Sequence, residues 1–145
     1  MKNSIHNSQI EEIKALFSKS PDPQEKYKTI IELGRNLPDM PARLQTEENR
    51  VLGCQSTLYL HSYLEDDRLY FFVSSDALIS KGLAAILTLS YQGLALEEML
   101  KSPPNFIKDL DILSSISFNR SNGFANIYQK MKNQALSLLL SKHSR

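Results

Sequence analysis

Cys54 is the residue best suited to chemistry in this sequence: it is the single cysteine, in the polar run Gly53-Cys54-Gln55-Ser56. A lone thiol cannot form an internal disulfide, nor can it supply the three or four cysteine ligands of a zinc or iron–sulfur site. It can fill a core, or it can react as a thiolate. Gly53 also permits backbone conformations that other residues resist. This context leaves a structural and a reactive Cys54 both open.

A cysteine hydrolase would need a histidine base close to Cys54. The chain has three histidines. We expect His6 and His143 to lie in frayed termini. His61 lies along an extended segment, up to about 23 Å from Cys54. Thiol exchange needs only a thiolate, an attackable sulfur and access, so the residues favour exchange over hydrolysis.

The other polar groups give weaker signals. The acidic residues 65–67 are predicted to form a solvated turn. Asp76 is expected just inside a helix start, where the helix dipole favours a carboxylate. Arg120 stands in a segment that we expect to cap the last helix, through Asn119 or Ser121. No cluster of ligand residues and no glycine-rich phosphate loop is visible, so the sequence predicts no metal and no cofactor.

Length and charge narrow the class of protein. A chain of 145 residues predicts a single domain over residues 1–145, with an ordered core at about 8–140. The 17 basic and 16 acidic residues are interspersed, and the net charge is +1, which argues against nucleic acid or a membrane as partner. The most apolar stretch, residues 77–91, is too short and too polar to span a bilayer. With one free cysteine and no visible signal peptide, we expect a cytoplasmic protein.

Two helices are predicted before the cysteine. Residues 8–11 read Ser-Gln-Ile-Glu, a capping-box pattern, so the first helix is predicted to start at Ser8. Asp22 and Pro23 are a suitable cap and first residue for the second helix, which Pro38 must end. An irregular polar stretch, residues 39–50, then leads to Cys54.

Two strands and a buried helix are predicted after the cysteine. Residues 57–64 and 68–74 alternate apolar with polar or aromatic side chains, which predicts a β-hairpin. The next helix, capped by Ser74 or Ser75, is apolar almost all the way round, so we expect it in the core. Gly93 is its expected end.

Shorter helical segments are predicted at residues 96–100 and 106–113. The last helix has the clearest apolar stripe, which comprises Phe124, Ile127, Tyr128, Met131, Ala135, Leu138 and Leu139. The sum is an α+β fold in which helices flank a small antiparallel sheet of two to three strands.

Four segments, in order, resemble the SufE family of sulfur-acceptor proteins, which includes the CsdE proteins. They are residues 27–34 with Leu37-Pro38, residues 51–56, residues 74–83 and residues 120–124. The likeness covers about residues 8–140. Tyr59 stands where the family often has tryptophan, Phe124 where it has leucine, and the turn at 65–67 lacks the usual glycine. The first two changes keep a large apolar body, and the third concerns only the turn type.

The resemblance implies a SufE-like fold and a carrier rather than an enzyme. By position, Cys54 would accept persulfide sulfur from a pyridoxal-phosphate-dependent cysteine desulfurase of the SufS or CsdA kind. The protein would stimulate that desulfurase and pass the sulfur to an iron–sulfur scaffold complex. It would bind no cofactor itself. The resemblance leaves a homodimer of the free protein open.

The resemblance also assigns supporting roles. Gly53, Gln55 and Ser56 would shape the cysteine loop, and Asp76 and Arg120 would orient that loop or contact the partner. Family likeness further implies that apolar surface shelters the cysteine until docking.

Two other functions compete with the carrier. A cluster scaffold needs several cysteine or histidine ligands around one site, and this sequence offers one cysteine. An allosteric adaptor that regulates the desulfurase without carrying sulfur stays open, because a binding surface cannot be read from the sequence.

Overall fold

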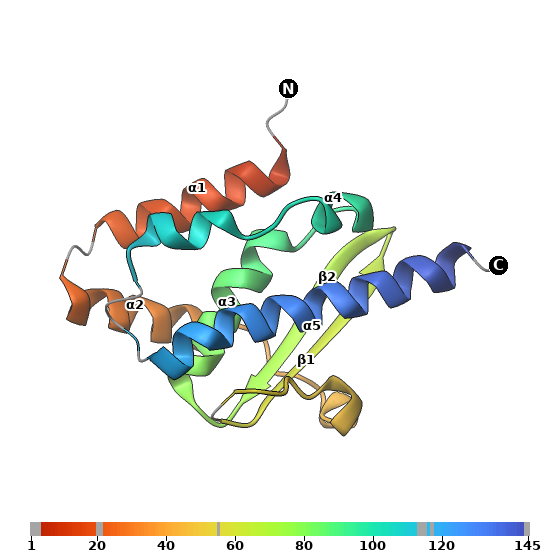
Figure 1. Cartoon of the computed structure of the whole chain (residues 1–145), viewed down its shortest axis with the longest axis horizontal. Helices are drawn as coiled ribbons and strands as arrows, with labels where there is room; N and C mark the ends of the chain where they lie inside the picture. The colour runs from red at the N-terminus through yellow and green to blue at the C-terminus, as the bar shows by residue number, and fades with distance from the viewer. Residues whose placement is uncertain (1–3, 20–21, 55, 113–115, 117, 144–145) are drawn as a thin grey trace.

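The structure, a computed structural model, describes residues 4–19, 22–54, 56–112, 116 and 118–143, with side chains in the last range from Gly123 onward. The elements lie in the order α1 (Ile5–Ser18), α2 (Pro23–Arg35), η1 (Ala42–Leu44), η2 (Glu47–Asn49), β1 (Leu58–Glu65), β2 (Arg68–Ser75), α3 (Leu78–Tyr91), α4 (Leu96–Leu100), η3 (Asn105–Leu110) and α5 (Phe118–His143). The α+β prediction is confirmed: α3 packs on β2, and α5 crosses the hairpin on β1 (Figure 1).

The β-hairpin is confirmed, with a register that runs from Leu58 opposite Ser75 to Glu65 opposite Arg68. Asp66 and Asp67 close the turn at φ 53° and 64°. Two positive φ values suit the right-handed twist of the strands, and aspartate tolerates them better than most residues. The turn therefore forms without glycine.

Helix α3 lies at the centre of the core, as its composition predicts, since buried residues occupy nearly all of its circumference. Its expected start is wrong. Strand β2 runs on to Ser75, and the helix begins at Leu78. The Ser75 hydroxyl donates to the Thr57 carbonyl at 2.8 Å and accepts the Ala77 N–H at 3.2 Å, so it serves the sheet end instead of capping the helix. The stop at Gly93 is confirmed by its φ of 82°.

The first helix starts earlier than the capping box predicts. Ser4 is the cap, and its hydroxyl accepts the Asn7 N–H at 3.1 Å. His6, expected to be frayed, is only 7% exposed. Its Nδ1 donates to the Ser90 carbonyl at 2.7 Å and its ring stacks on Tyr91, so tertiary contacts extend the helix. The predicted start of α2, with Asp22 as cap and Pro23 next, is confirmed.

The positions of the later helices agree with the prediction, but their types and bounds differ from it. Helix α4 is confirmed at Leu96–Leu100. Of the segment predicted at 106–113, residues 106–110 belong to the 3₁₀-helix η3, and residue 113 lies outside the described residues. Helix α5 begins at Phe118, so Asn119 and Ser121 lie inside it and are not its cap. Packing of its long apolar stripe stabilises the helix enough to carry these polar residues at its start. None of the helices in the described ranges has the length and hydropathy needed to cross a bilayer.

Helices α2 and α3 approach so closely that only glycine fits between them. A Cβ on Gly82 would lie 2.1 Å from the Ile30 carbonyl oxygen, and one on Gly34 would lie 2.7 Å from the Gly82 nitrogen. Because both obstacles are backbone atoms, no side-chain rotation can relieve them. This contact sets the position of α3, whose first turns carry residues of the candidate site.

We expect Gly82→Ala to lower the free energy of unfolding by at least about 1–3 kcal/mol, the usual range for overpacking, because α2 must move away. Chemical denaturation would measure this loss, provided that the dependence of the free energy of unfolding on denaturant concentration is the same in variant and wild type. Gly123→Ala in α5 is the matched control, since no heavy atom of the described residues outside its own helix lies within 4 Å of its added Cβ. That control should stabilise by up to about 1 kcal/mol. Equal effects of the two changes would contradict the close helix contact.

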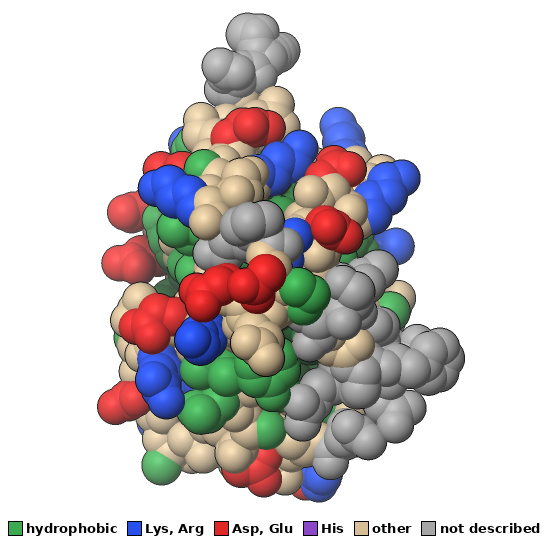
Figure 2. Space-filling model, turned by 90° about the vertical axis from the view of Figure 1, so that its left-hand side faces the viewer, with side chains coloured by type: hydrophobic (Ala, Val, Ile, Leu, Met, Phe, Trp, Pro, Cys, Tyr) green, Lys and Arg blue, Asp and Glu red, His purple; other side chains and the backbone are tan. Residues whose placement is uncertain are grey.

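The surface carries exposed apolar side chains. On the side that lies to the left in Figure 1, hydrophobic side chains gather in the lower half, below a band of acidic side chains (Figure 2). Two large exposed hydrophobic residues flank elements of the candidate site: Leu52, which is 74% exposed, and Leu78, which is 51% exposed.

Candidate functional site

Cys54 lies in a loop whose two ends are joined directly before β1. The Val51 N–H donates to the Leu58 carbonyl at 2.8 Å, and Arg50 forms an isolated antiparallel bridge with Tyr59. The chain leaves the sheet after Val51, turns at Leu52 and Gly53, and returns at Leu58. Cys54 therefore lies at a loop-to-strand junction, and hydrogen bonds to the sheet hold the base of its loop.

Gly53 is required at the turn for two reasons. Its φ is +85°, a conformation that side chains with a Cβ resist. A Cβ at this position would also lie 2.6 Å from Asn126 Nδ2. That nitrogen donates to the Gly53 carbonyl at 3.1 Å, so the same small residue lets the α5 side chain reach the loop backbone.

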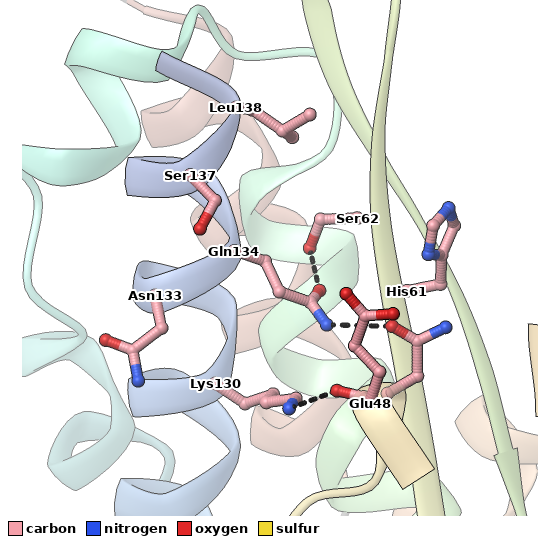
Figure 3. Close-up of a pocket in the computed structure, with 9 residues that line it drawn as sticks. Glu48, His61, Ser62, Lys130, Asn133, Gln134, Ser137 and Leu138 are labelled. Atoms are coloured by element: carbon pink, nitrogen blue, oxygen red, sulfur yellow. Dashed lines mark hydrogen bonds between the residues drawn. The ribbon is translucent and has the colours of Figure 1, made fainter. Parts of the chain in front are cut away.

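Two more side chains on the same face of α5 hold the segment before the loop. Lys130 Nζ donates to the Glu48 carbonyl at 2.6 Å. Gln134 Nε2 donates to Asn49 Oδ1 at 3.2 Å (Figure 3). Residues 126, 130 and 134 are spaced by four, which places them on one side of a helix. Asn126, Lys130 and Gln134 are called the α5 polar row below.

Gln134 also joins α5 to the sheet. Its Nε2 donates to the Leu60 carbonyl at 2.8 Å. Its Oε1 accepts the Ser62 hydroxyl at 2.7 Å (Figure 3). Ser62 is buried on the inner face of β1, so these bonds satisfy polar groups that would otherwise be costly there. Gln134 therefore fixes α5, β1 and the loop base in one arrangement.

The Cys54 thiol is half-buried and packs against the edge of the hydrophobic core. Burial raises the pKa of Cys54 above the ordinary value, because the thiolate would be desolvated there. The resting side chain is therefore a neutral thiol at neutral pH. A sulfur in this position is sheltered, and it must become more accessible before it reacts as a thiolate.

Two of the expected supporting residues, Ser56 in the loop and Asp76 after β2, join the cysteine loop to the chain around the start of α3. The Ser56 hydroxyl donates to the buried Ser80 hydroxyl in the first turn of α3 at 2.7 Å. The Thr57 N–H donates to Asp76 Oδ1 at 3.2 Å, and Asp76 N–H donates back to the Thr57 carbonyl at 3.3 Å. Asp76 was expected just inside a helix, but it precedes α3, since this pairing continues the hairpin.

For two other expected residues the structure describes no side chain. Gln55 lies outside the described residues. The backbone of Arg120 belongs to α5, and only its side chain is outside the description. Their roles in shaping the loop or meeting a partner stay predictions.

His61, the histidine nearest to Cys54 in the sequence, lies within strand β1. It lines a cleft of about 290 Å³ between β1 and α5, together with Glu48 and Lys130 (Figure 3). Cys54 is not among the residues described as lining this cleft. Burial, followed by the charge of Arg43, lowers the pKa of His61. In the described ranges, no three side chains of histidine, cysteine, aspartate or glutamate gather as a metal site.

Sequence reasoning missed the α5 polar row. Its residues lie one position before Ile127, Met131 and Ala135 of the apolar stripe. A polar row with helical spacing beside an apolar stripe is a usable signal that such a helix holds a polar segment at its edge. The partners, however, are mostly backbone carbonyls, which leave no mark in the sequence.

Comparison with known proteins gives a family and several relatives. The family profile "SufE: Fe-S metabolism associated domain" matches residues 11–135. SufE-like protein 1, chloroplastic/mitochondrial, of Arabidopsis thaliana is 32% identical over 89% of this chain and 35% of its own length. Cysteine desulfuration protein SufE of Plasmodium falciparum is 34% identical over 81% and 49%. Sulfur acceptor protein CsdE of Escherichia coli is 29% identical over 78% of both chains.

The chain thus spans about a third of the Arabidopsis protein and about half of the Plasmodium one. A solved structure, the solution structure of a hypothetical protein from Thermus thermophilus, matches with a TM-score of 0.75 at 20% identity. It covers 91% of this chain and 96% of its own. At that identity the match supports the fold alone, and it agrees with the α+β fold described above.

The raised pKa of Cys54 predicts slow alkylation of the folded protein. Because burial favours the neutral thiol, the fraction of thiolate at pH 7 is lower than in an unfolded chain. The pH midpoint of the rate with iodoacetamide should therefore be higher in the native protein than in the same protein in denaturant. Equal rates and equal midpoints in the two states would show that Cys54 is not sheltered.

Proposed function

Because the chain belongs to the SufE family, described as an Fe-S metabolism associated domain, we propose that it accepts persulfide sulfur from a cysteine desulfurase on Cys54. The observation that carries this proposal is the place of the single thiol. It is half-buried on a loop whose base is fixed, beside the exposed Leu52. The names of relatives, a sulfur acceptor protein and a cysteine desulfuration protein, support the same role.

The transfer is a thiol exchange on sulfur. The Cys54 thiolate attacks the terminal sulfur of a cysteine persulfide on the desulfurase. A new S–S bond forms to Cys54 while the old S–S bond breaks, and the desulfurase cysteine leaves as a thiolate. One sulfur atom moves, and no net oxidation or reduction occurs. The proton lost by Cys54 balances the one that the leaving thiolate can take up.

The single cysteine suits a carrier. A second thiol close by could attack the Cys54 persulfide, release the sulfur as sulfide and leave a disulfide. This sequence has no other cysteine, so no thiol of the same chain can cause that loss. Half-burial adds protection against small thiols and oxidants in solution.

The partners follow from the family and remain part of the proposal. The donor is a pyridoxal-phosphate-dependent desulfurase of the SufS or CsdA kind, which the carrier stimulates by removing its persulfide. The recipient is an iron–sulfur scaffold complex. A reducing compartment such as the cytoplasm suits the free thiol. Self-association of the free protein into a homodimer is a further expectation.

Cys54→Ser should abolish sulfur uptake while it leaves docking nearly unchanged. A serine hydroxyl is not ionised near neutral pH and cannot hold a persulfide, but it keeps the size of the side chain. Intact mass after incubation with desulfurase and cysteine should show one added sulfur atom on the wild type, removable by a thiol reductant, and none on the variant. Affinity for the desulfurase should change by less than about tenfold, or 1.4 kcal/mol.

A serine variant that stimulates the desulfurase as well as the wild type would instead favour the allosteric adaptor. If Cys54→Ser abolishes both binding to the desulfurase and folding, Cys54 is a structural residue of the core.

Leu52 should contribute to docking, since it lies at the exposed turn next to the thiol. Leu52→Ala removes apolar surface that a partner would bury, so we expect binding to the desulfurase to weaken by about tenfold, which is 1.4 kcal/mol. Leu140→Ala is the matched control, because Leu140 is similarly exposed at 70% but lies near the end of α5. Calorimetry would measure both; equal losses would place the docking surface elsewhere.

A further inference from the structure

The loop tip that carries Cys54 has little side-chain burial to hold it. Leu52 is exposed, and Gly53 has no side chain and is also exposed. Cys54 itself is only half-buried. Because the hydrophobic contribution scales with apolar area removed from water, this tip gains far less from burial than the strand that follows it.

A polar contact holds the tip instead. Asn126 Nδ2 donates to the carbonyl of Gly53, the residue directly before Cys54. The other two members of the α5 polar row bind the chain before the Val51–Leu58 hydrogen bond, so they hold the base of the loop. Asn126 binds beyond that bond, on the part of the loop that can move while the base stays in place.

We propose that Asn126 is a positioning residue for Cys54: its carboxamide holds the loop tip against α5 with the thiol half-buried, and release of this bond frees the thiol for reaction. The consequence for sulfur transfer rests on the proposed function, whereas the assignment of the loop contact does not. Neither the family profile nor the names of the relatives assign a role to this residue.

The strength of the contact suits a reversible hold. One neutral hydrogen bond near the surface exchanges with hydrogen bonds to water, so its net effect on an opening equilibrium is about fivefold. The closed loop is therefore favoured, and a docking partner can open it with modest binding energy. Gly53 is part of the device, because a Cβ there would displace the Asn126 amide.

The test is the alkylation rate of Cys54 in the free 145-residue chain with iodoacetamide at fixed pH. Asn126→Ala should raise the rate about fivefold, since the loop opens more often. Asn126→Asp should raise it at least as much, because a carboxylate of the same shape cannot donate to the Gly53 carbonyl. The matched control is Asn133→Ala on the same helix, where the exposed amide bonds Gln129 and not the loop. Its rate should equal that of the wild type.

A second readout separates positioning from general stability. Amide hydrogen exchange in the β1–β2 hairpin should stay unchanged in Asn126→Ala and Asn126→Asp, while Cys54 becomes more reactive. Gly53→Ala should also speed alkylation, and by a smaller factor when Asn126 is already alanine, because the clash with the amide is then gone.

Wild-type alkylation rates in both Asn126 variants would overturn the inference. An equal rise in the alkylation rate of the Asn133→Ala control would also overturn it. The same holds if amide hydrogen exchange throughout the hairpin becomes faster by the same factor as alkylation. Sulfur uptake from a desulfurase judges the proposed function separately. If uptake fails in the wild type while the alkylation pattern holds, the carrier role is wrong and the loop contact stands.

Discussion

The antiparallel register of β1 and β2 is the constraint on which the candidate site depends. With Leu58 opposite Ser75, Thr57 meets Asp76, and Ser56 reaches Ser80 in the first turn of α3. The loop before the hairpin and the helix after it therefore lie together, although they are distant in sequence. A slip of one residue would turn the buried leucines of β1 outward, so the apolar core enforces this register. The same burial that stabilises the fold thus places the chemistry.

At its place before the hairpin, Cys54 must be sheltered from solvent at rest and accessible when it reacts. Shelter from solvent keeps the thiol neutral, because burial raises the pKa of Cys54. Reaction requires the thiolate and an open path to it. A fully buried cysteine would need much of the core to open, whereas a fully exposed one would lose its protection. Half-burial on a tip with few apolar contacts keeps the cost of opening small compared with the stability of the domain.

The sequence predicts those features of the site that depend on local patterns. Strand alternation predicted the hairpin, Asp22-Pro23 the start of α2, and the glycine beside Cys54 the loop. Prediction failed where distant contacts decide. His6 is buried because Tyr91, remote in sequence, stacks on it. The shift in the start of α3 has the same origin, since Ser75 stays paired with Thr57 across the sheet.

The hydrogen bonds of the α5 polar row are hard to predict from the sequence, and they allow the side chains of the loop to vary. Asn126, Lys130 and Gln134 bind backbone carbonyls of Gly53, Glu48 and Leu60. A carbonyl is present whatever side chain its residue carries, so these bonds place few demands on the loop sequence. The side chain of Leu52 is left exposed to meet a partner, while the apolar stripe of α5 keeps the donors in position. Helix α5 therefore packs into the core through its apolar stripe and holds the reactive loop through the neighbouring polar row.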